Sequence, residues 1–439
     1  MQMYHISDVL RRRSITALVS AGLVIIATVP LAALEVSTAG RSGAAFPGFS
    51  RQTGLACSSC HFQKYPALNA FGRGFAAAGY TAMGSQETVK GGRLSLPAVL
   101  NSSIFLKVRY QKTNGTEVPG ERTTNIGELQ FPDEFVVLMG GRVSENAGFV
   151  IEGQLSEASA PFVGGFKMPF TFALGSGGIR ADVIPFSTEH LGPSYGFELL
   201  NTGAVRHVRV NENRNAVSAQ QYIGTATAAE GVAFVLADPK WFVNVTKWSP
   251  NHFAGAQGVA NGSPTATYLR AAFMPTVASW DLGVGIQSWS GSAGIANAAG
   301  TGVDLVKTGA LAFDAQAQGE ISGLPLGVYV TQGKSDAGTI FNSRTRSRSA
   351  LTMTAEVGVM QRPFLTVVGG YRKADNGRAA ANSTDNAITF GVNWMASQNV
   401  GLHWVLNRFS GSAYAAGQGP MLPGGTGTML NTLMLSAGF

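Results

Sequence analysis

The chain has 439 residues, of which 45% are hydrophobic and only 13% are charged, and its formal net charge is +7. Soluble domains carry about 25% charged residues, so this chain has few charges to cover a water-facing surface. Low charge and 56 glycines are typical of β proteins that face lipid outside and water inside. Part of the positive charge lies in an arginine run at 11–13 that we expect to be removed, so it predicts no nucleic-acid function.

Residues 1–39 are predicted to be a secretory signal peptide. The arginine run is followed by an almost wholly apolar span at 15–34, which together form the n-region and h-region of such a signal. Small residues follow, and we place cleavage between residues 39 and 45. The alternative is a permanent membrane anchor, because the apolar span is just long enough to cross a bilayer.

Residues 46–90 are predicted to form a small, partly helical segment. Pro66 suits the first turn of a helix, and Leu68, Phe71 and Phe75 recur at helical spacing. The segment is too short to hold a hydrophobic core of its own. It is therefore expected to pack against a cofactor or against the rest of the chain.

The two cysteines of the chain lie in this segment, as Cys57 and Cys60, and His61 follows directly. Cys-x-x-Cys-His is the attachment motif of haem c. The two thiols bond to the haem and the histidine becomes the proximal iron ligand. A thioredoxin-like redox pair would need a βαβ context, and a zinc site would need a second pair of ligands nearby. The sequence therefore predicts one covalent haem c, held by Cys57, Cys60 and His61.

The distal ligand of the haem iron is left open by the sequence. Met83, which lies in the same segment, is the residue that we expect there. A distal side open to water is one alternative. The other candidate residues are Met168, which precedes a proline, and His190, His207, His252 and His403.

From residue 94 to residue 439 the hydrophobic pattern has a period of two, which predicts a transmembrane β-barrel. A soluble sandwich would also alternate, but its polar face would carry more lysine and glutamate. At roughly 20 residues per strand and connection, the region holds about 16 antiparallel strands. The clearest alternating stretches are 104–111, 149–155, 241–246, 280–287, 311–318, 388–394 and 400–407.

Four stretches rich in glycine, alanine, serine and asparagine are predicted to be outer loops: 253–265, 291–303, 334–349 and 411–427. Arg344, Arg346 and Arg348 lie in one of them and are interpreted as a solvated or lipopolysaccharide-facing strip. Four acids are interpreted as polarity of the lumen wall: Glu152, Asp281, Asp314 and Glu356. Seven aromatic residues at strand ends fit interfacial girdles: Trp241, Trp248, Trp280, Trp289, Tyr371, Trp394 and Trp404.

The segment around the cysteines, FPGFSRQTGLACSSCH at 46–61, resembles the start of the fused outer-membrane monohaem cytochrome c–porins of iron-oxidising bacteria. The continuation YPALNAFGR at 65–73 is similar too, as is the layout of a signal, a one-haem segment and a barrel that ends in Phe439. The specific match covers the haem segment, and the rest of the likeness is architectural. Cys57, Cys60 and His61 carry over as haem-binding residues, and no iron-binding residue does.

This resemblance implies an iron(II)-oxidising oxidoreductase in the outer membrane of a Gram-negative bacterium. Extracellular Fe(II) would be the electron donor, and a periplasmic c-type cytochrome or another carrier would be the acceptor. The expected fold is all-β, with the helical haem segment docked in the barrel lumen. Two other functions stay open: a haem-bearing porin for solutes, and electron transfer with a donor other than iron.

Overall fold

The computed structural model describes residues 47–439 except 85, 93, 121–122, 156–161, 204–217, 253–263, 297–301, 362–363 and 416–424. The predicted signal peptide and its cleavage region lie outside the described residues. Among the residues that are described, no helix is long and apolar enough to cross a membrane.

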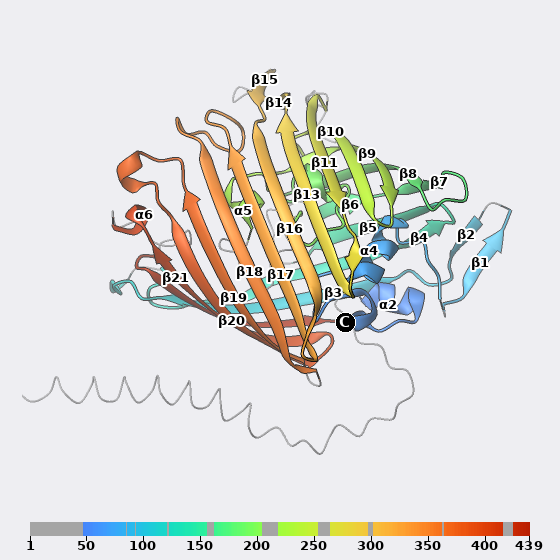
Figure 1. Cartoon of the computed structure of the whole chain (residues 1–439), viewed down its shortest axis with the longest axis horizontal. Helices are drawn as coiled ribbons and strands as arrows, with labels where there is room; N and C mark the ends of the chain where they lie inside the picture. Colours follow the sequence, from blue (N-terminus) through green and yellow to red (C-terminus); the bar gives the residue numbers. More distant parts are fainter. Residues whose placement is uncertain are drawn as a thin grey trace, which may run out of the picture. The chain divides into compact units, whose positions relative to one another are not determined.

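The dominant feature is a closed antiparallel β-barrel (Figure 1). The ring closes where β22 (Met429–Gly438), the last strand, pairs with β3 (Ser102–Thr113), the first. The segments β6 and β7 form one interrupted strand, as do β11 and β12, so the described part of the barrel has 16 strands. This number confirms the prediction from the alternating pattern.

The barrel segments between these two are β4 (Glu128–Ser144), β5 (Ala147–Gln154), β6 (Val163–Lys167), β7 (Phe170–Ala173), β8 (Arg180–Thr188), β9 (Ala229–Asp238), β10 (Trp241–Ser249), β11 (Ala266–Phe273), β12 (Thr276–Val277), β13 (Trp280–Ser290), β16 (Ala310–Ile321), β17 (Leu324–Ser335), β18 (Arg348–Gln361), β19 (Phe364–Asp375), β20 (Asn386–Ser397) and β21 (Val400–Ser410).

Two hairpins form separate two-stranded sheets: β1 (Thr88–Gly91) with β2 (Leu94–Pro97), and β14 (Ser292–Ala296) with β15 (Val303–Lys307). The second hairpin begins in the predicted outer loop at 291–303, so this connection between β13 and β16 has strand structure of its own. The small residues of this stretch have low β propensity, and pairing across the hairpin overrides it.

The helices are short, and three of them precede the barrel. These are α2 (Pro47–Thr53), α3 (Cys57–Cys60) and α4 (Ala70–Ala77); later come η2 (Pro193–Tyr195), α5 (Ala219–Tyr222), η4 (Ala380–Asn382) and α6 (Ser412–Ala415). The prediction of a helix from Pro66 is wrong, because α4 begins four residues later. The side chain of Asn69 caps it there by accepting a hydrogen bond from the Gly72 amide at 2.9 Å.

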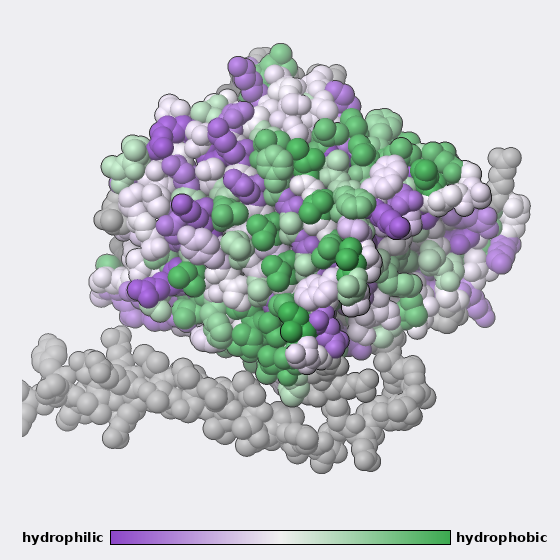
Figure 2. Space-filling model, in the orientation of Figure 1, coloured by the Kyte–Doolittle hydropathy of each residue, from purple (hydrophilic) through white to green (hydrophobic). Residues whose placement is uncertain are grey.

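Side chains alternate between the two faces of the wall. On β10, Val243 and Val245 are 38% and 39% exposed on the outside, while Phe242, Asn244 and Thr246 are fully buried inside. Figure 2 shows hydrophobic side chains gathered over the outward face of the strands. In hydrocarbon every backbone group must be paired, and a closed barrel meets that condition. The protein is therefore an outer-membrane β-barrel of a Gram-negative bacterium.

The two ends of the barrel differ. At one end the strands are joined by short turns at 239–240, 322–323 and 398–399; at the other end the connections are long, as at 336–347 and 376–385. In outer-membrane barrels the short turns are periplasmic and the long loops extracellular. Phe439 pairs with Ile104, the third residue of β3, at the short-turn end.

Two of the expected girdle tryptophans are not at the lipid interface. Trp248 and Trp289 are 0% and 3% exposed and point into the lumen, where Phe341 packs against both rings. They fall on the inward face because they are an odd number of positions from their lipid-facing neighbours, such as Val245 and Ile286. Trp404 and Tyr371 do face outward, at 40% and 41% exposure.

The outward face of β10 gives a test of the membrane assignment. Val245→Arg should destabilise the barrel by about 2–4 kcal/mol, because a cation near the bilayer midplane is poorly solvated. Thr276→Arg, at an exposed site beside a short turn, should cost only about 0–1 kcal/mol. The free energy of unfolding of both variants is measured by urea titration in lipid, with the folded and unfolded fractions read from their separate gel bands. Equal effects would contradict the assignment of the lipid-facing band.

Candidate functional site

The segment 47–84 lies inside the barrel at the short-turn end. Polar side chains tie it to several strands of the wall. Arg73 forms a buried ion pair with Asp281, with Nη2 2.6 Å from Oδ2. The other ties are Gln63 with Thr366 on β19, Gln52 with Arg142 on β4, and Leu68 with Asn201. Asn201 belongs to the connection 189–228 between β8 and β9, whose described parts fold into the lumen and are here called the inward-folded segment. This docking confirms the expectation that the segment rests on the barrel.

Helices α3 and α4 are held in close contact. A Cβ added to Gly72 would lie 2.1 Å from the carbonyl oxygen of Cys60, so only glycine allows this approach. Asn69 bridges the two helices. Its side-chain Nδ2 donates a hydrogen bond to the carbonyl of Ser59 at 3.0 Å, and its backbone N–H donates one to the carbonyl of Cys60 at 3.0 Å. The cysteine pair is therefore positioned by α4.

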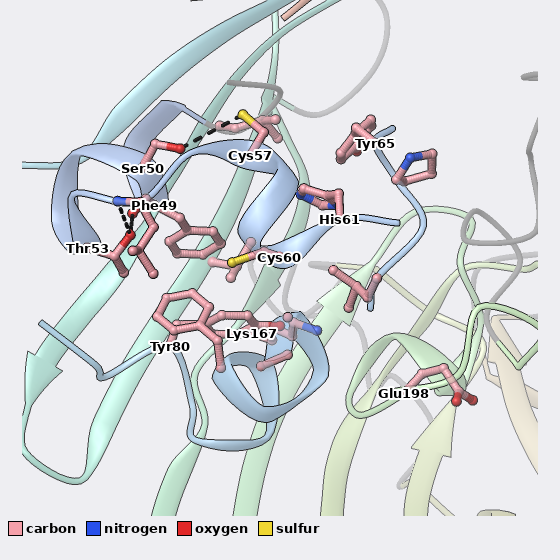
Figure 3. A pocket seen from close by; sticks show the side chains of 18 of the residues that line it. Phe49, Ser50, Thr53, Cys57, Cys60, His61, Tyr65, Tyr80, Lys167 and Glu198 are labelled. Atoms are coloured by element: carbon pink, nitrogen blue, oxygen red, sulfur yellow. Dashed lines mark hydrogen bonds between the residues drawn. The ribbon is translucent and has the colours of Figure 1, made fainter. Parts of the chain in front are cut away.

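Cys57, Cys60 and His61 line one cavity with a volume of about 240 Å³. Figure 3 shows them above this space, with Tyr80 and Lys167 below it. The walls are mainly apolar and aromatic. Phe49, Ser50, Leu55, Tyr65, Leu68, Phe75 and Ala76 come from the short segment, and Leu138, Val150, Glu152, Leu191, Tyr195 and Glu198 from the barrel and the inward-folded segment.

The aromatic walls are packed into a fixed arrangement. Phe49 stacks on Tyr80 with centroids 5.1 Å apart, and it meets Phe75 edge to face at the same distance. Tyr65 meets the His61 ring edge to face at 5.6 Å. Such walls suit a large flat apolar ligand.

His61 is oriented by the backbone. Its Nδ1 lies 3.2 Å from the carbonyl oxygen of Ala67. A carbonyl only accepts, so Nδ1 carries the proton and Nε2 presents a lone pair. This is the second-shell contact that metal-binding histidines usually make. Burial lowers the pKa of His61 to about 4, although the Ala67 hydrogen bond acts in the other direction, so the ring is neutral at pH 7.

The two thiols differ in surroundings. Cys57 Sγ lies 3.9 Å from the hydroxyl of Ser50. Burial, and then the neighbouring Cys57, raise the pKa of Cys60, so that thiol stays protonated at neutral pH. Protonated thiols are inert as nucleophiles, and neither cysteine forms a disulfide.

These residues fit a covalent haem. Two thiols one helical turn apart, an imidazole with a lone pair and an aromatic enclosure are the parts that haem c attachment requires. The residues that would hold it are Cys57, Cys60 and His61. Among the described lining residues, Lys167 is the single lysine or arginine, and it is positioned to neutralise a carboxylate of a ligand bound in the cavity. Its Nζ donates a hydrogen bond to the backbone carbonyl of Tyr195 at 3.1 Å and lies 5.0 Å from the centroid of the Tyr195 ring.

The expected distal ligand, Met83, is not part of this lining. It precedes Gly84, whose amide donates to the Gln52 carbonyl near the end of α2. Among the described lining residues there is no methionine, and His61 is the one histidine. His252 contacts Ser187 and Val163 instead, His403 lies between Asn393 and Ser436, His207 is outside the described residues, and Met168 and His190 do not line the cavity.

Metal ligands do not cluster elsewhere in the described part of the chain. There, no group of three or more histidine, cysteine, aspartate or glutamate side chains could hold a metal ion. Of the lumen acids, Asp281 and Asp314 are paired with arginines, Glu356 accepts a hydrogen bond from Tyr329, and Glu152 lines the cavity.

The inward-folded segment is not predicted by any pattern in the sequence. Residues 189–228 connect β8 to β9, and their described parts cross to the opposite wall (Figure 1). Thr202 donates to Asp314 on β16 at 2.6 Å, and the Ala219 amide donates to Thr331 on β17 at 3.0 Å. Leu200 and Ile223 of this segment are fully buried. The chain therefore fills part of its own lumen.

An ion cluster anchors this segment. Arg270 on β11 lies between Glu198 of the segment and Asp314 on β16, with N–O distances of 2.9 and 2.6 Å. All three side chains are at most 2% exposed. Glu198 Oε1 also accepts from the amides of Leu199 and Leu200, at 3.0 and 2.8 Å. No periodicity or motif could have joined residues so far apart in sequence.

The fold and the lumen define a porin-like outer-membrane barrel with an internal segment. No protein-family model and no curated protein sequence matches the chain. Among solved structures it is similar to OprB from Pseudomonas putida, at 10% identity over 77% of this chain and 94% of that one, with a TM-score of 0.48. It is also similar to OmpT from Vibrio cholerae, at 10% identity over 78% of this chain and 98% of that one, with a TM-score of 0.46. A mutant Rh. blastica porin is similar at 10% identity over 78% of this chain and 100% of that one, with a TM-score of 0.45.

The contact at Gly72 predicts a local effect. Gly72→Ala should loosen α4 from α3, because overpacking of this kind costs about 1–3 kcal/mol. Hydrogen exchange in 57–77 should then accelerate while the barrel strands stay protected. Gly74→Ala is the matched control, since nothing lies within 4 Å of a Cβ at that position of the same helix. The same exchange in both variants would refute the close contact.

The ion cluster predicts a global effect. Arg270→Gln should destabilise the protein by about 3–5 kcal/mol, because two buried carboxylates lose their partner. The temperature at which the folded gel band disappears measures the loss. A variant that also carries Glu198→Gln and Asp314→Asn should recover part of it. If the triple variant is no more stable than Arg270→Gln, charge compensation is not what holds the segment.

Proposed function

We propose that this protein is an outer-membrane monohaem c-type cytochrome–porin that oxidises extracellular Fe(II) and passes the electron to a periplasmic c-type cytochrome or similar carrier. One observation carries the proposal. Cys57, Cys60 and His61, in haem-attachment spacing, line a single aromatic cavity inside a closed membrane barrel.

The residues have separate tasks in this proposal. The thiols of Cys57 and Cys60 would hold the haem through thioether bonds, and Nε2 of His61 would bind its iron, with the ring oriented by the Ala67 carbonyl. The aromatic walls would contact the faces of a flat ligand, and Lys167 would balance negative charge. A haem bound there supplies a centre that carries one electron at a time, which suits a one-electron donor such as Fe(II).

The location also suits the proposal. About 30 Å of hydrocarbon separates an external donor from the periplasm, and the barrel encloses a protein-filled passage through it. The cavity lies towards the short-turn end, where a periplasmic acceptor would dock. Tyr195, which lines the cavity, packs against a buried cluster that continues towards the outer loops through Phe186, Trp248, Tyr268, Trp289 and Phe341.

Solute passage is the second candidate, because the architecture is porin-like. The inward-folded segment disfavours this function. Leu200, Ile223 and Trp248 are fully buried inside the lumen, so packed side chains replace water in the described part of the cross-section. Diffusion of solutes needs a water-filled path, and this segment narrows it.

Haem attachment is tested first. Cys57→Ser with Cys60→Ser should abolish haem staining after denaturing electrophoresis, because no thioether can form. The barrel should still assemble, since both residues lie outside every strand; the folded gel band checks this. Staining of the double variant at the wild-type level would overturn the proposal.

Iron oxidation is tested next. Purified oxidised protein mixed anaerobically with excess Fe(II) should show the absorption bands of reduced haem. His61→Ala should keep the covalent stain but lose this response, because the proximal ligand is gone. If wild-type haem stays oxidised at acidic and neutral pH, while dithionite reduces it, the donor is not iron.

A further inference from the structure

Five arginines gather at the long-loop end of the barrel: Arg344, Arg346, Arg348, Arg372 and Arg378. The first three are interpreted from the sequence as a solvated or lipopolysaccharide-facing strip, and the lipopolysaccharide-facing alternative does not hold for Arg348. Its guanidinium lies 4.9 Å from the ring centroid of Tyr222, which is 3% exposed on α5 in the lumen. The guanidinium of Arg372 lies 4.8 Å from the same ring. The cluster therefore opens into the outer mouth of the barrel.

The loops hold these side chains together. Arg344 Nη1 donates to the Asn376 carbonyl at 2.7 Å, and Arg346 Nη1 donates to the Arg378 carbonyl. These bonds tie the loop 336–347 to the loop 376–385. Burial, and then the charge of Arg378, lower the pKa of Arg344, which reflects how close the like charges are.

The acids nearby do not balance this charge. Asp385 is occupied by Arg372 and by the hydroxyls of Tyr222 and Tyr414, at 2.9 and 2.7 Å. Asp375 accepts from Arg346 at 3.2 Å and from a backbone amide. Asp336 lies in the loop 336–347 as well, so five arginines against three aspartates leave an excess of two positive charges.

Two of the arginines are available for a ligand. Among the described residues, neither Arg348 nor Arg378 forms an ion pair, and the buried Nε of Arg348 has no hydrogen-bond partner there. Guanidinium groups bind carboxylates and phosphates with paired, charge-assisted hydrogen bonds. A ring of arginines at a barrel mouth selects anions.

We propose that this outer arginine cluster binds multivalent oxyanions, carboxylates or phosphates, and that the ferrous donor reaches the barrel as an anionic chelate. The second part rests on the proposed iron oxidation; the first does not. An aquated Fe(II) cation is repelled by the excess positive charge, while a chelate with net negative charge is attracted. Lipopolysaccharide phosphates have the same chemistry, but they lie outside the barrel, and Arg348 and Arg372 face its lumen.

Anion binding is measured directly on the full-length protein in detergent, by calorimetric titration with citrate and with pyrophosphate. Arg348→Gln with Arg378→Gln should weaken both by about tenfold or more, as expected for lost charge-assisted bonds. Arg408→Gln is the matched control, because Arg408 is exposed on the outward face near the same end. No binding of either anion, equal loss in the control, or binding of lipopolysaccharide alone would overturn the site.

The chelate is tested by the rate of haem reduction. With Fe(II)–citrate, the double variant should be slower than wild type; with aquated Fe(II) it should be faster, because repulsion is relieved. If both rates fall or neither changes, the donor is not selected by this cluster. If neither form of iron reduces wild-type haem while citrate still binds, iron oxidation fails and the anion site stands.

Discussion

The closed ring of backbone hydrogen bonds is the constraint on which the rest of this structure depends. In hydrocarbon an unpaired amide or carbonyl costs several kcal/mol, so the pairing of β22 with β3 is a condition for insertion. Closure also divides the side chains into two sets. Those outside meet lipid, and the described ones inside meet one another, the segment 47–84 and the inward-folded segment.

That division explains why a small segment can form a cavity that it could not hold alone. The segment 47–84 supplies the cysteines, the histidine and most aromatic walls, while the barrel supplies the other side through Val150 and Lys167. Arg73 and Asp281 bind the two parts together. The polar lumen is therefore a scaffold for the cavity as much as a passage.

The alternating pattern predicted the barrel, its strand number and the inward face of acids such as Asp314, because a period of two depends only on local sequence. The motif likewise marked Cys57, Cys60 and His61. The inward segment was missed, since its hydrogen bonds to β16 and β17 join residues far apart in the chain and leave no local period. The direction of Arg348 was missed for the same reason.

The distal side of the cavity could not be predicted either. Proximity in sequence favoured Met83, but the chain turns away along α2 after Tyr80, and residues from other elements take that side of the cavity. Lys167 and Glu198 illustrate this, because each reaches the cavity from a separate connection or strand. Side chains that converge from several elements follow from tertiary packing alone.

The most direct test of the account places the protein in liposomes that enclose oxidised soluble cytochrome c, with an impermeant Fe(II) chelate outside. The account predicts that the enclosed cytochrome is reduced through the wild-type barrel and not through a His61→Ala barrel. If the enclosed cytochrome stays oxidised while the same chelate reduces it after detergent lysis, the protein does not carry electrons across the membrane.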